Sequence, residues 1–526
     1  MRLKTYLQGV LILMLLASTQ ATAQSFDLLI KHGRLLDGSG NPWHFADVAI
    51  QGDRIVAVGD LEGSEAARVL DARGLYVAPG FIDVHSHAGP GLATRPLSGA
   101  LPLLKQGITT IMINPDGGGP VDLPAQRKVL LADGLGVNVA QLVPHGSVRR
   151  RVMDMADHPP NGEELERMKS LVRAGMKAGA FGLSSGLFYA PGSYAATEEV
   201  VELAKVAAEF GGVYTSHIRD EADYNIGLVG AVEEVITIAK EAGLPGIITH
   251  IKALGPRVWG YSTALVKRIQ GAREQGVEVY ADQYPYQASG TSITGALVPR
   301  WAQVGGREAL LRRIGDSQAR LRLRADMLAN LARRGGAERL QFRSHPADPS
   351  IEGKTLQQVA RERDTDPIDL AMKLLKAGGA GLVSFNMDPD DVATLMRQDW
   401  VMTCSDGGLV PTGRGVPHPR NYGTFPRKIH KYVLQEKVLG LAQAIRSMTS
   451  LPAAVFGVHD RGRIQPGALA DLVVFDLESI RDRATYRKPH QLSEGIVYLL
   501  VNGKLALDQG RPTGKLNGRV LSHRPR

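Results

Sequence analysis

Two histidines stand two residues apart in the run Phe81-Ile82-Asp83-Val84-His85-Ser86-His87. In a β-strand alternate side chains share one face, so Asp83, His85 and His87 project together while the apolar residues between them pack the other way. Two imidazoles on one face at the end of a strand are able to hold a single cation. Because Gly89-Pro90-Gly91 follows, the run predicts a buried strand that opens onto a loop, where α/β barrels keep their chemistry.

Further candidate ligands stand directly after other predicted strands: Asp116, His217, His250 and Asp406. Taken singly, each has an ordinary structural explanation, since a lone histidine is more often a hydrogen-bonded core residue and an aspartate in a Gly-rich turn is more often a turn residue. The strand ends of a parallel barrel ring one mouth, however, so residues far apart in the sequence would converge there. Their shared placement predicts a metal site.

The elements that must position these residues alternate between strands and helices. After the first strand, the predicted strands are 108–113, 137–143, 180–183, 212–216, 246–249, 277–281 and 401–404. Helical patterns, such as those of 162–178, 197–209 and 227–241, separate most of them. Eight strands with intervening helices predict an α/β fold of the (β/α)8, TIM-barrel type over about residues 79–456.

This barrel region is longer than the usual ~250 residues, so an insert is expected after the seventh strand, at about residues 287–398. Residues 307–334 carry eight Arg against three acidic residues, a net charge of +5. We interpret this segment as a solvated helical insert and as a lid over the barrel mouth. A ninth strand-like run at 381–385 leaves the strand count open.

Both ends of the chain carry short alternating strands. They are predicted at 26–30, 46–50, 55–58 and 69–75, and again at 471–475, 495–501 and 504–507. Neither end has enough strands to bury a face alone. The two ends, residues 24–78 and 457–526, are therefore expected to pair into one small β-sandwich domain.

The first 23 residues have the pattern of a cleaved signal peptide. Arg2 and Lys4 precede the apolar run 10–17, and Ala21-Thr22-Ala23 is an A-x-A site. The sequence predicts a mature chain that starts near Gln24 and is periplasmic or secreted, with no stable membrane insertion after cleavage; an uncleaved anchor is the alternative. No later segment reaches the length of a transmembrane span.

The composition, with 44% hydrophobic residues, 60 Gly and 29 Pro, is that of a turn-rich globular protein. Cys404 is the only cysteine, so an intrachain disulfide is excluded. The formal charge of +9 comes without a basic-aromatic repeat, and no nucleic acid is expected as a partner. Attraction of anionic substrates and plain solubility are the two explanations for the basic charge.

Several motifs extend the metal-site pattern. They are Gly80-Phe81-Ile82-Asp83-Val84-His85-Ser86-His87, Gly182-Leu183-Ser184-Ser185-Gly186-Leu187, Thr215-Ser216-His217-Ile218-Arg219-Asp220-Glu221, Thr249-His250-Ile251-Lys252, Asp282-Gln283-Tyr284-Pro285-Tyr286, Ser405-Asp406-Gly407, His418-Pro419-Arg420-Asn421-Tyr422-Gly423-Thr424-Phe425-Pro426-Arg427 and Ala470-Asp471-Leu472-Val473-Val474-Phe475-Asp476. Together they resemble the amidohydrolase superfamily and, within it, the D-aminoacylase (N-acyl-D-amino-acid deacylase) family, from residue 26 to about 521. The resemblance implies a zinc-dependent barrel beside a small β domain formed by both chain ends.

The sequence departs from this family at one position. Asp116 aligns where the family usually has a cysteine after the second strand. A carboxylate is able to bind or bridge metals, but it is harder than a thiolate and shifts the preference away from soft zinc chemistry. One or two Zn²⁺ ions, or another divalent metal, are therefore expected. The fourth strand ends in Ser184-Ser185 without a lysine, which argues against the hydantoinase and dihydroorotase branch.

These residues suggest a hydrolytic mechanism. His217, His250 and Asp116 are expected to hold a metal, with His85 and His87 completing the same or a second site, and the metal would lower the pKa of water to about 7. Asp406 is the predicted general base, which would later protonate the departing amine. Its alternative role is a turn or N-cap residue.

Substrate-binding candidates stand on the same predicted rim. Lys252, two residues after His250, is expected to hold the α-carboxylate of the substrate, and Arg420 to reach its side chain. The resemblance places Tyr189 and Tyr284 near the carboxylate, and Ser289 lies on a neighbouring loop. Each is alternatively a rim residue without contact to substrate. A weaker candidate, His145, would stabilise the carbonyl oxygen or merely cap a strand.

The predicted activity is metal-dependent hydrolysis of N-acyl amino acids to a carboxylate and a free amino acid, with the D configuration implied by the resemblance. One rival hypothesis is a dipeptidase or carboxypeptidase-like enzyme acting on short peptides with a free carboxylate, for which Lys252 would serve equally well. A second rival is a metal-free binding relative that has lost activity. A substrate panel separates the first from the main hypothesis, and metal analysis separates the second.

Overall fold

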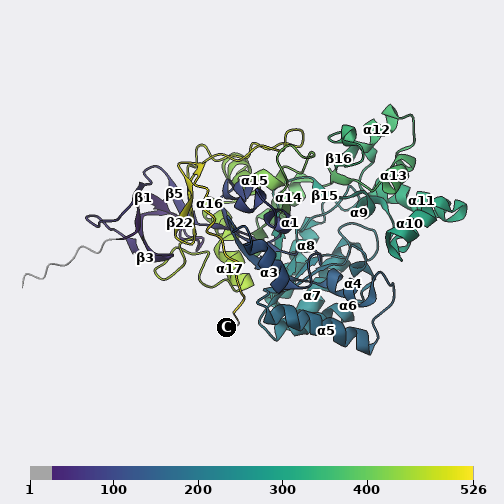
Figure 1. The fold of residues 1–526 in the computed structure, drawn as a ribbon, viewed down its shortest axis with the longest axis horizontal. Helices are drawn as coiled ribbons and strands as arrows, with labels where there is room; N and C mark the ends of the chain where they lie inside the picture. The colour runs from purple at the N-terminus through teal and green to yellow at the C-terminus, as the bar shows by residue number, and fades with distance from the viewer. Residues whose placement is uncertain (1–25, 525–526) are drawn as a thin grey trace, which may run out of the picture.

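The structure is a computed structural model that describes residues 26–524. The predicted signal peptide, residues 1–23, lies outside the described residues. Three regions follow one another along the long axis of the molecule: a β domain, a central unit of parallel strands with helices around it, and an insert at the far end (Figure 1). No described helix combines the length and the apolar character that a membrane crossing requires.

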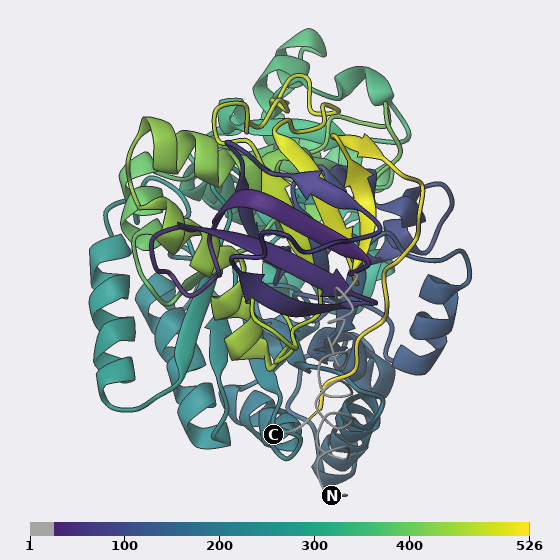
Figure 2. The same ribbon diagram turned by 90° about the vertical axis from the view of Figure 1, so that its left-hand side faces the viewer.

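The β domain is one sheet of nine strands that combines both ends of the chain. The strands are β1 (Leu28–Leu35), β2 (His44–Gln51), β3 (Arg54–Gly59), β4 (Val69–Asp71), β5 (Tyr76–Pro79), β20 (Leu472–Phe475), β21 (Ile496–Val501), β22 (Lys504–Asp508) and β23 (Arg511–Pro512). Figure 2 shows the purple N-terminal strands beside the yellow C-terminal ones.

Strand β5 joins the two halves of this sheet. It pairs parallel with β1 and antiparallel with β20, where Ala78 lies opposite Val473. The predicted pairing of the chain ends is confirmed. The predicted β-sandwich is instead one continuous hydrogen-bonded sheet, because β5 carries the pairing from one end of the chain to the other. Alternate side chains of both halves, Val77 and Leu472 among them, share one core.

The central region, which we call the parallel-strand unit, contains two parallel sheets and a short pair. The first sheet holds β6 (Phe81–Asp83), β8 (Ile108–Ile113) and β9 (Asn138–Gln141). The second holds β10 (Val143–Pro144), β11 (Gly182–Gly186), β12 (Val213–His217), β13 (Gly246–Ile248), β14 (Val279–Gln283) and β18 (Val401–Thr403). The short pair is β7 (Ser86–His87) with β19 (Gly407–Gly408). Continuous burial, as along β8, is typical of parallel strands covered on both faces.

The two sheets are connected at both ends. Only Leu142 separates β9 from β10, and β7 and β19 continue the first and last strands into a parallel pair. The Asp83 carboxylate reinforces this seam by accepting hydrogen bonds from the Ser405 backbone N–H, at 2.7 Å, and from its hydroxyl. The last strand is thus held beside the first.

Helices connect and cover the parallel strands. They are α1 (Gly89–Leu92), α2 (Leu101–Leu104), α3 (Leu123–Leu131), α4 (His145–Met153), α5 (Gly162–Lys177), α6 (Thr197–Ala208), α7 (Gly227–Ala242), α8 (Ser262–Glu274), α14 (Pro389–Met396), α15 (Arg420–Arg427), α16 (Leu441–Met448) and α17 (Ser450–Phe456), with the π-helical segment η6 (Lys428–Gln435) and short 3-10 turns. The predicted helix 162–178 begins as expected, because Asn161 and Glu164 form a capping box at its N-terminus.

The insert combines helices with a small sheet. Strands β15 (Ser289–Ser292) and β16 (Leu340–Ser344) flank β17 (Gly381–Ser384), antiparallel on both sides. The helices are α9 (Ile293–Leu297), α10 (Gly306–Gly315), α11 (Ser317–Arg333), α12 (Leu356–Glu362) and α13 (Pro367–Lys376). The predicted helical segment 307–334 is confirmed as α10 and α11, whereas the small antiparallel sheet of the insert was not predicted. The strand-like run at 381–385 is β17, which pairs inside the insert and is not a ninth parallel strand.

Candidate active site

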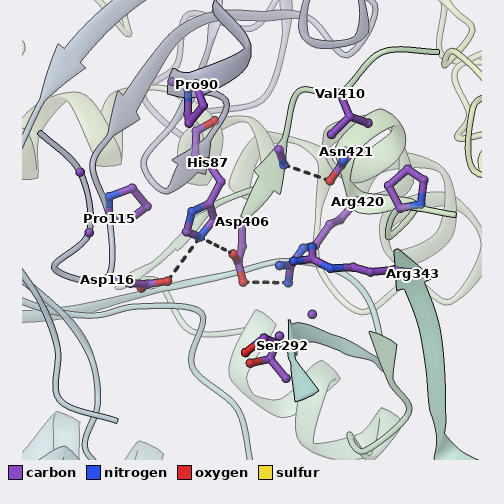
Figure 3. A pocket seen from close by; sticks show the side chains of 18 of the residues that line it. His87, Pro90, Pro115, Asp116, Ser292, Arg343, Asp406, Val410, Arg420 and Asn421 are labelled. Atoms are coloured by element: carbon purple, nitrogen blue, oxygen red, sulfur yellow. Dashed lines mark hydrogen bonds and ion pairs between the residues drawn. The ribbon is translucent and has the colours of Figure 1, made fainter. Parts of the chain in front are cut away.

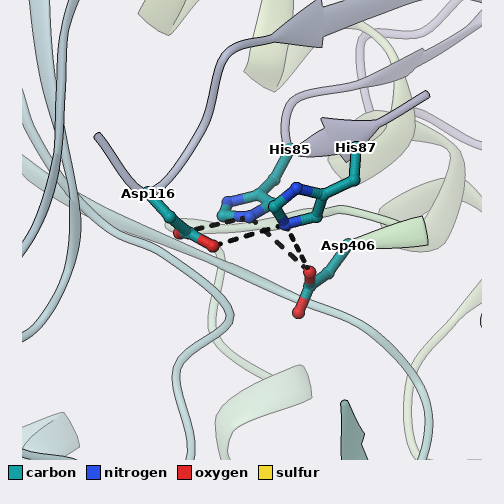
Figure 4. A group of neighbouring side chains, drawn as sticks. All are labelled: His85, His87, Asp116 and Asp406. Atoms are coloured by element: carbon teal, nitrogen blue, oxygen red, sulfur yellow. Dashed lines mark ion pairs between the residues drawn. The ribbon is translucent and has the colours of Figure 1, made fainter. Parts of the chain in front are cut away.

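The predicted ligands and the predicted base meet at one place, where the parallel strands end. One group of nitrogen and carboxylate oxygen atoms comes from His85, His87, Asp116 and Asp406, and another from Asp116, His217 and His250. Within each group the candidate ligand atoms all lie within 4.8 Å of one another. In Figure 4 the two histidines after β6 stand between Asp116 and Asp406.

Asp116 belongs to both groups. Its Oδ1 lies 3.4 Å from His85 Nε2, 3.5 Å from His250 Nε2 and 3.8 Å from His217 Nδ1. Its Oδ2 lies 3.3 Å from His87 Nε2. The carboxylate at the position where the family usually has cysteine is thus central to the cluster, with Oδ1 near three histidines and Oδ2 near the fourth. Carboxylates bind or bridge divalent cations in this arrangement.

The donor set fits a divalent cation. Two atoms that are each about 2.0–2.1 Å from a tetrahedral zinc ion lie about 3.3 Å apart. The ring nitrogens His217 Nδ1 and His250 Nε2 are 2.9 Å apart, and the nitrogen–oxygen distances around Asp116 run from 3.3 to 3.8 Å. His85 Nε2 and Asp116 Oδ1 are buried and lack a hydrogen-bond partner among the described residues. A cation between them satisfies these atoms.

Electrostatics favour positive charge at this cluster. Burial raises the pKa of Asp116, but the neighbouring His85, His250 and His87 outweigh burial and hold it well below its ordinary value. Burial lowers the pKa of His217 to about 4, which leaves this ring neutral, the form that binds metal. Burial also lowers the pKa of His87, but hydrogen bonds to Asp116 and Asp406 raise it to about 9. The two carboxylates thus attract a cation.

Backbone strain marks the same residues. Asp116, His250 and Asp406 have φ angles of +55°, +37° and +47°, in the left-handed region that non-glycine residues seldom adopt. Each follows the end of a parallel strand by two or three residues and contributes its side chain to the cluster. Such strain persists where the surrounding structure fixes it, and it is concentrated at functional sites.

Glu221 supports the ligands from behind, and the sequence did not single it out as a site residue. Its Oε1 lies 3.2 Å from His250 Nδ1, and its Oε2 lies 3.9 Å from His217 Nε2. A carboxylate on the far nitrogen of a ligating histidine fixes the tautomer and the ring orientation. The available signal was spacing, because Glu221 follows His217 by four residues within one motif.

Two aspartates hold the strand ends in register. Asp83 bonds Ser405 across the seam described above, and burial raises its pKa to about 6 despite these hydrogen bonds. Asp282 accepts a hydrogen bond of 2.7 Å from the backbone N–H of His250. Both carboxylates stood in quoted motifs without an assigned role. They position His85 and His250 through the backbone.

Asp406 stands between the cluster and Arg420. Its Oδ1 is 3.2 Å from His87 Nε2, and its Oδ2 is 2.7 Å from a guanidinium nitrogen of Arg420. Burial raises the pKa of Asp406, but the Arg420 guanidinium and the neighbouring histidines hold it well below its ordinary value. Asp406 is therefore an anion with one oxygen directed to the metal cluster, the state that a general base requires.

A cavity of about 1500 Å³ opens over this cluster. Its lining includes all of the predicted substrate-binding residues: Tyr189, Lys252, Tyr284, Ser289 and Arg420. The parallel-strand unit and the insert both contribute walls, and Figure 3 shows Asp406 between His87 and Arg420, with Arg343 of the insert beyond Arg420. The insert therefore borders the pocket directly.

Like Arg420, which pairs with Asp406, three more of these side chains have protein partners. The Lys252 ammonium pairs with Glu221 and lies 2.8 Å from His250 Nδ1. The Ser289 hydroxyl bonds the Asn386 amide at 3.1–3.2 Å. The Tyr284 hydroxyl is directed to Met387 Sδ, at 3.8 Å, so the face of its ring supports Arg420, 4.8 Å from the ring centre.

The other aromatic candidate, Tyr189, stacks on His217 with ring centres 4.6 Å apart, and its hydroxyl lies 3.3 Å from Thr291 of the insert. His145 is elsewhere. Its Nε2 lies 2.9 Å from Glu199 Oε1, which also pairs with Arg149, and His145 does not line the cavity. This buried pair fixes α4 against α6, a structural role.

The comparison with known proteins gives consistent results. Residues 68–506 match the model of the amidohydrolase family. N-acyl-D-glutamate deacylase of Alcaligenes xylosoxydans xylosoxydans is 36% identical, with 95% of this chain and 97% of that relative covered. The crystal structure of N-acyl-D-glutamate deacylase from Bordetella bronchiseptica, with zinc and a phosphonate mimic of the tetrahedral intermediate, is 34% identical over 95% of this chain and 100% of that one, with a TM-score of 0.81. A D-aminoacylase with a binuclear metal centre is 32% identical over 94% of this chain and 100% of that one, with a TM-score of 0.80.

Proposed function

Because this chain belongs to the amidohydrolase family, we propose that it hydrolyses the amide bond of N-acyl-D-amino acids to a carboxylate and a free D-amino acid in a metal-dependent reaction. The observation that carries the proposal is the convergence of Asp406 with four histidines and Asp116, under a cavity large enough for a small acylated amino acid. Two of the relatives named above are N-acyl-D-glutamate deacylases, and their similarity to this chain covers nearly its whole length. They support the substrate class.

The metal ligands in this proposal are His217, His250 and Asp116, with His85 and His87 at a second position that shares Asp116. A bound zinc ion would supply two effects: it acidifies water, from a pKa of 15.7 to about 7, and it polarises the acyl carbonyl. The zinc complex and the binuclear centre of the neighbours favour one or two such ions. Glu221 and Asp282 keep the ligand rings oriented.

Asp406 is the proton carrier. It accepts the proton of the attacking water and delivers it to the nitrogen of the departing amine. Arg420 keeps this carboxylate anionic and, through its own backbone, is held in place by His418. The His418 ring lies 2.9 Å from the Ala288 carbonyl through Nε2, and its Nδ1 accepts a hydrogen bond of 3.0 Å from the Arg420 N–H.

Lys252 is proposed to bind the α-carboxylate of the substrate. It lies next to the ring of a metal ligand, so an anion there is close to the amide that is cleaved. Tyr189 and Ser289 line the same cavity, while Tyr284 acts as a platform beneath the cations. These roles leave the acyl chain on the exposed side, near His87, whose side chain is 42% exposed.

We propose further that the parallel strands close into a (β/α)8 barrel, supported by the β7–β19 pair, and that the insert after β14 acts as a lid. We also propose that residues 1–23 are a signal peptide and that the enzyme acts in the periplasm or outside the cell. Amino-terminal sequencing of the exported protein tests the last point, and a mature chain that still contains residues 1–23 contradicts it.

The decisive experiment is hydrolysis of paired D and L N-acetyl amino acids, with metal quantified in the same sample and a chelated sample as control. We expect turnover of D substrates only, at least one divalent ion per chain, and loss of turnover after chelation. Intact N-acetyl-D-amino acids together with cleaved dipeptides would favour the peptidase. Absence of stoichiometric metal after supplementation would favour an inactive scaffold.

A further inference from the structure

The cavity is larger than an N-acetyl amino acid requires. Pockets for small molecules commonly measure ~300–1,000 Å³, whereas this cavity measures about 1500 Å³. One part of its lining, which we call the α1–α3 groove, comes from α1, the loop after β8 and α3. Its apolar lining includes Pro90, Ala93, Pro115, Ala125, Val129 and Leu130.

The α1–α3 groove begins at the metal-ligand candidates. His87 and Asp116 line the cavity at this point, and Figure 3 shows Pro90 close to His87 and Pro115 close to Asp116. A group bound in the groove is therefore continuous with the reacting centre.

Helix α3 presents one face to the groove along its length. The lining residues Asp122, Ala125, Gln126, Val129 and Leu130 recur at intervals of three or four, the spacing of one helix face. From the first to the last of them the helix rises about 12 Å. The groove therefore has the length of several methylene groups.

The polar side chains of the groove already have hydrogen bonds within the protein. The Asn114 and Gln126 amides donate to each other at 2.9 and 2.8 Å. The Asp122 carboxylate accepts a hydrogen bond of 3.0 Å from the Ala125 N–H. An alkyl chain leaves these bonds intact, whereas a peptide would bring N–H and C=O groups that require partners of their own.

Charge is distributed unequally around the cavity. Among residues 26–524, the lysine and arginine side chains that line the cavity all belong to elements outside the groove: Lys252, Arg334, Arg343, Arg414 and Arg420. The carboxylate of an N-acyl amino acid is attracted to that side. The acyl group, on the other side of the amide that is cleaved, is then directed toward the uncharged groove.

Apolar groups of the groove are open to water. Val129 is 53% exposed, and Pro90 and Ala125 are also exposed. A chain that covers them removes apolar surface from water, which is favourable. Exposed apolar residues that adjoin a reacting centre are typical of ligand-binding grooves.

We propose that the α1–α3 groove binds the acyl chain of the substrate, so that the enzyme acts on N-acyl-D-amino acids with medium-length alkyl chains. This inference rests on the proposed function and names its substrate class. The reaction is otherwise unchanged. Water adds its hydroxyl to the acyl carbon, the C–N bond breaks and the amine takes the proton, which gives an alkanoate and a free D-amino acid.

The test measures kcat/KM for the acetyl, butanoyl, hexanoyl and octanoyl derivatives of one D-amino acid, below their micelle concentrations, with the zinc-supplemented full chain. The D-amino acid is the one with the highest turnover in the N-acetyl screen. A fully buried methylene contributes about fourfold to binding, so an open groove is expected to give about twofold per methylene, or about 60-fold from acetyl to octanoyl. A preference for the acetyl derivative would overturn the proposal.

A peptide of equal length tests the chemistry of the occupant. The N-acetylglycylglycyl group also has a chain of eight atoms, but it carries two peptide groups. We expect its derivative to be cleaved at least tenfold more slowly than the octanoyl derivative. Faster cleavage of the peptide would show that the groove binds peptides and would overturn the proposal.

Two pairs of variants locate the effect in the groove. Ala125→Trp fills the groove and Val129→Asp places a charge in it, so both should lower the octanoyl-to-acetyl ratio of kcat/KM at least tenfold. Leu131→Trp and Leu131→Asp are the matched controls, because Leu131 is on the same helix and 47% exposed but does not line the cavity. Their ratios are expected to equal that of the wild type. Unchanged ratios in both groove variants, or equal falls in the controls, would overturn the proposal.

Failure of the proposed function gives a different result. If no N-acyl-D-amino acid is hydrolysed, the proposed function fails, and the groove is judged by calorimetric binding of N-octanoyl-D-leucine and N-acetyl-D-leucine. Tighter binding of the octanoyl compound to the wild type, lost in Ala125→Trp, supports the groove. Equal binding of the two compounds refutes it.

Discussion

The parallel-strand unit and the insert form two walls of one cavity, but they hold their functional side chains in different ways. In the parallel-strand unit the ligands follow strand ends, three of the site residues have positive φ angles, and the backbone N–H of one of these, His250, is held by the buried Asp282 carboxylate. In the insert Arg343 is the extra residue of a β-bulge in an antiparallel strand, with Gly381 close to its side chain and no carboxylate ion pair among residues 26–524.

This difference separates two tasks. Bond cleavage requires several groups within a few ångströms of one point. The ends of the parallel strands with the metal-ligand candidates and Asp406, which we call the rim, are rigid and supply this precision. Selection among substrates requires only that one binding group lies at the right distance from the bond that is cleaved. An insert that packs around its own core, with Leu340, Phe342 and Leu382 among its members, is able to vary without disturbing the rim. Mutations on the two walls are therefore expected to have different kinetic signatures.

The largest effect is expected from the rim. Asp406→Asn removes the proton carrier and should lower kcat about 10³-fold while metal content stays unchanged, since general acid–base catalysis contributes 10²–10⁴-fold. Single-turnover rates with metal analysis measure both quantities. Asp482→Asn is the matched control, because Asp482 also forms a partly buried pair with an arginine, Arg427 at 2.8 Å, but does not line the cavity. A wild-type rate in Asp406→Asn would remove Asp406 from the mechanism.

A smaller effect is expected behind the rim. Glu221→Gln keeps the shape of the side chain but weakens its hold on His250, so the affinity for zinc should fall about 10- to 100-fold. Competition with a coloured chelator measures this affinity directly. Glu199→Gln, which alters the His145 partner in a comparable buried pair, should leave zinc affinity unchanged. Equal effects of the two variants would mean that Glu221 acts only through general stability.

On the insert wall, Gly381→Ala should raise KM about tenfold and leave metal content unchanged, because the added Cβ displaces the Arg343 side chain of the cavity wall. Initial rates over a range of substrate concentrations separate KM from kcat. Gly271→Ala in α8 serves as the control, since a Cβ there meets nothing within 4 Å. A fall in metal content in Gly381→Ala would show that the two walls are coupled after all.

The smallest effect on turnover is expected below the rim, at Lys428. Burial lowers its pKa from 10.5 to about 7, and its ammonium nitrogen bonds the hydroxyls of Thr403 and Ser447 at 2.8 and 2.9 Å. The unfolded chain therefore binds more protons than the native chain between pH ~7 and ~10. Stability should rise with pH in this window, by at most about 1.4 kcal/mol per pH unit, and this gain is absent below pH ~7.

Lys428→Met should remove this rise without changing kcat. Urea unfolding of the wild type and the variant from pH 6 to 10 measures the difference in slope. Parallel pH profiles for the two proteins would show that Lys428 keeps its proton in the folded state.

The same contrast explains what could be predicted from the sequence. The rim follows buried apolar runs that end in His or Asp, so His85, His87, Asp116, His217, His250 and Asp406 were predicted to converge, and they do. The pairing of the chain ends followed from the same strand patterns. The resemblance to a known family supplied the activity, and the comparisons agree with it.

The insert had no comparable pattern. Strand β15 reads Ser-Gly-Thr-Ser and has no apolar alternation, so nothing marked it as a strand beside β17. Arg343 was one of many arginines in this part of the chain, and only the bulge and the glycines around it distinguish it. The role of Glu221 was not predicted either. Glu221 contacts the second ring nitrogens of His217 and His250, and the sequence analysis had considered these two histidines only as metal ligands.

The position of β5 between β1 and β20 also determines when the sheet of the β domain can be completed during synthesis. Ala78 of β5 pairs with Val473 of β20, which the ribosome adds nearly four hundred residues later. A nascent chain therefore has one unpaired edge of β5 throughout most of its synthesis. Pairings so distant along the chain form slowly, and unpaired edges invite association with other chains. Maturation of this protein therefore depends on a late docking event, and shielding of β5 by a chaperone until the final strands emerge would raise its yield.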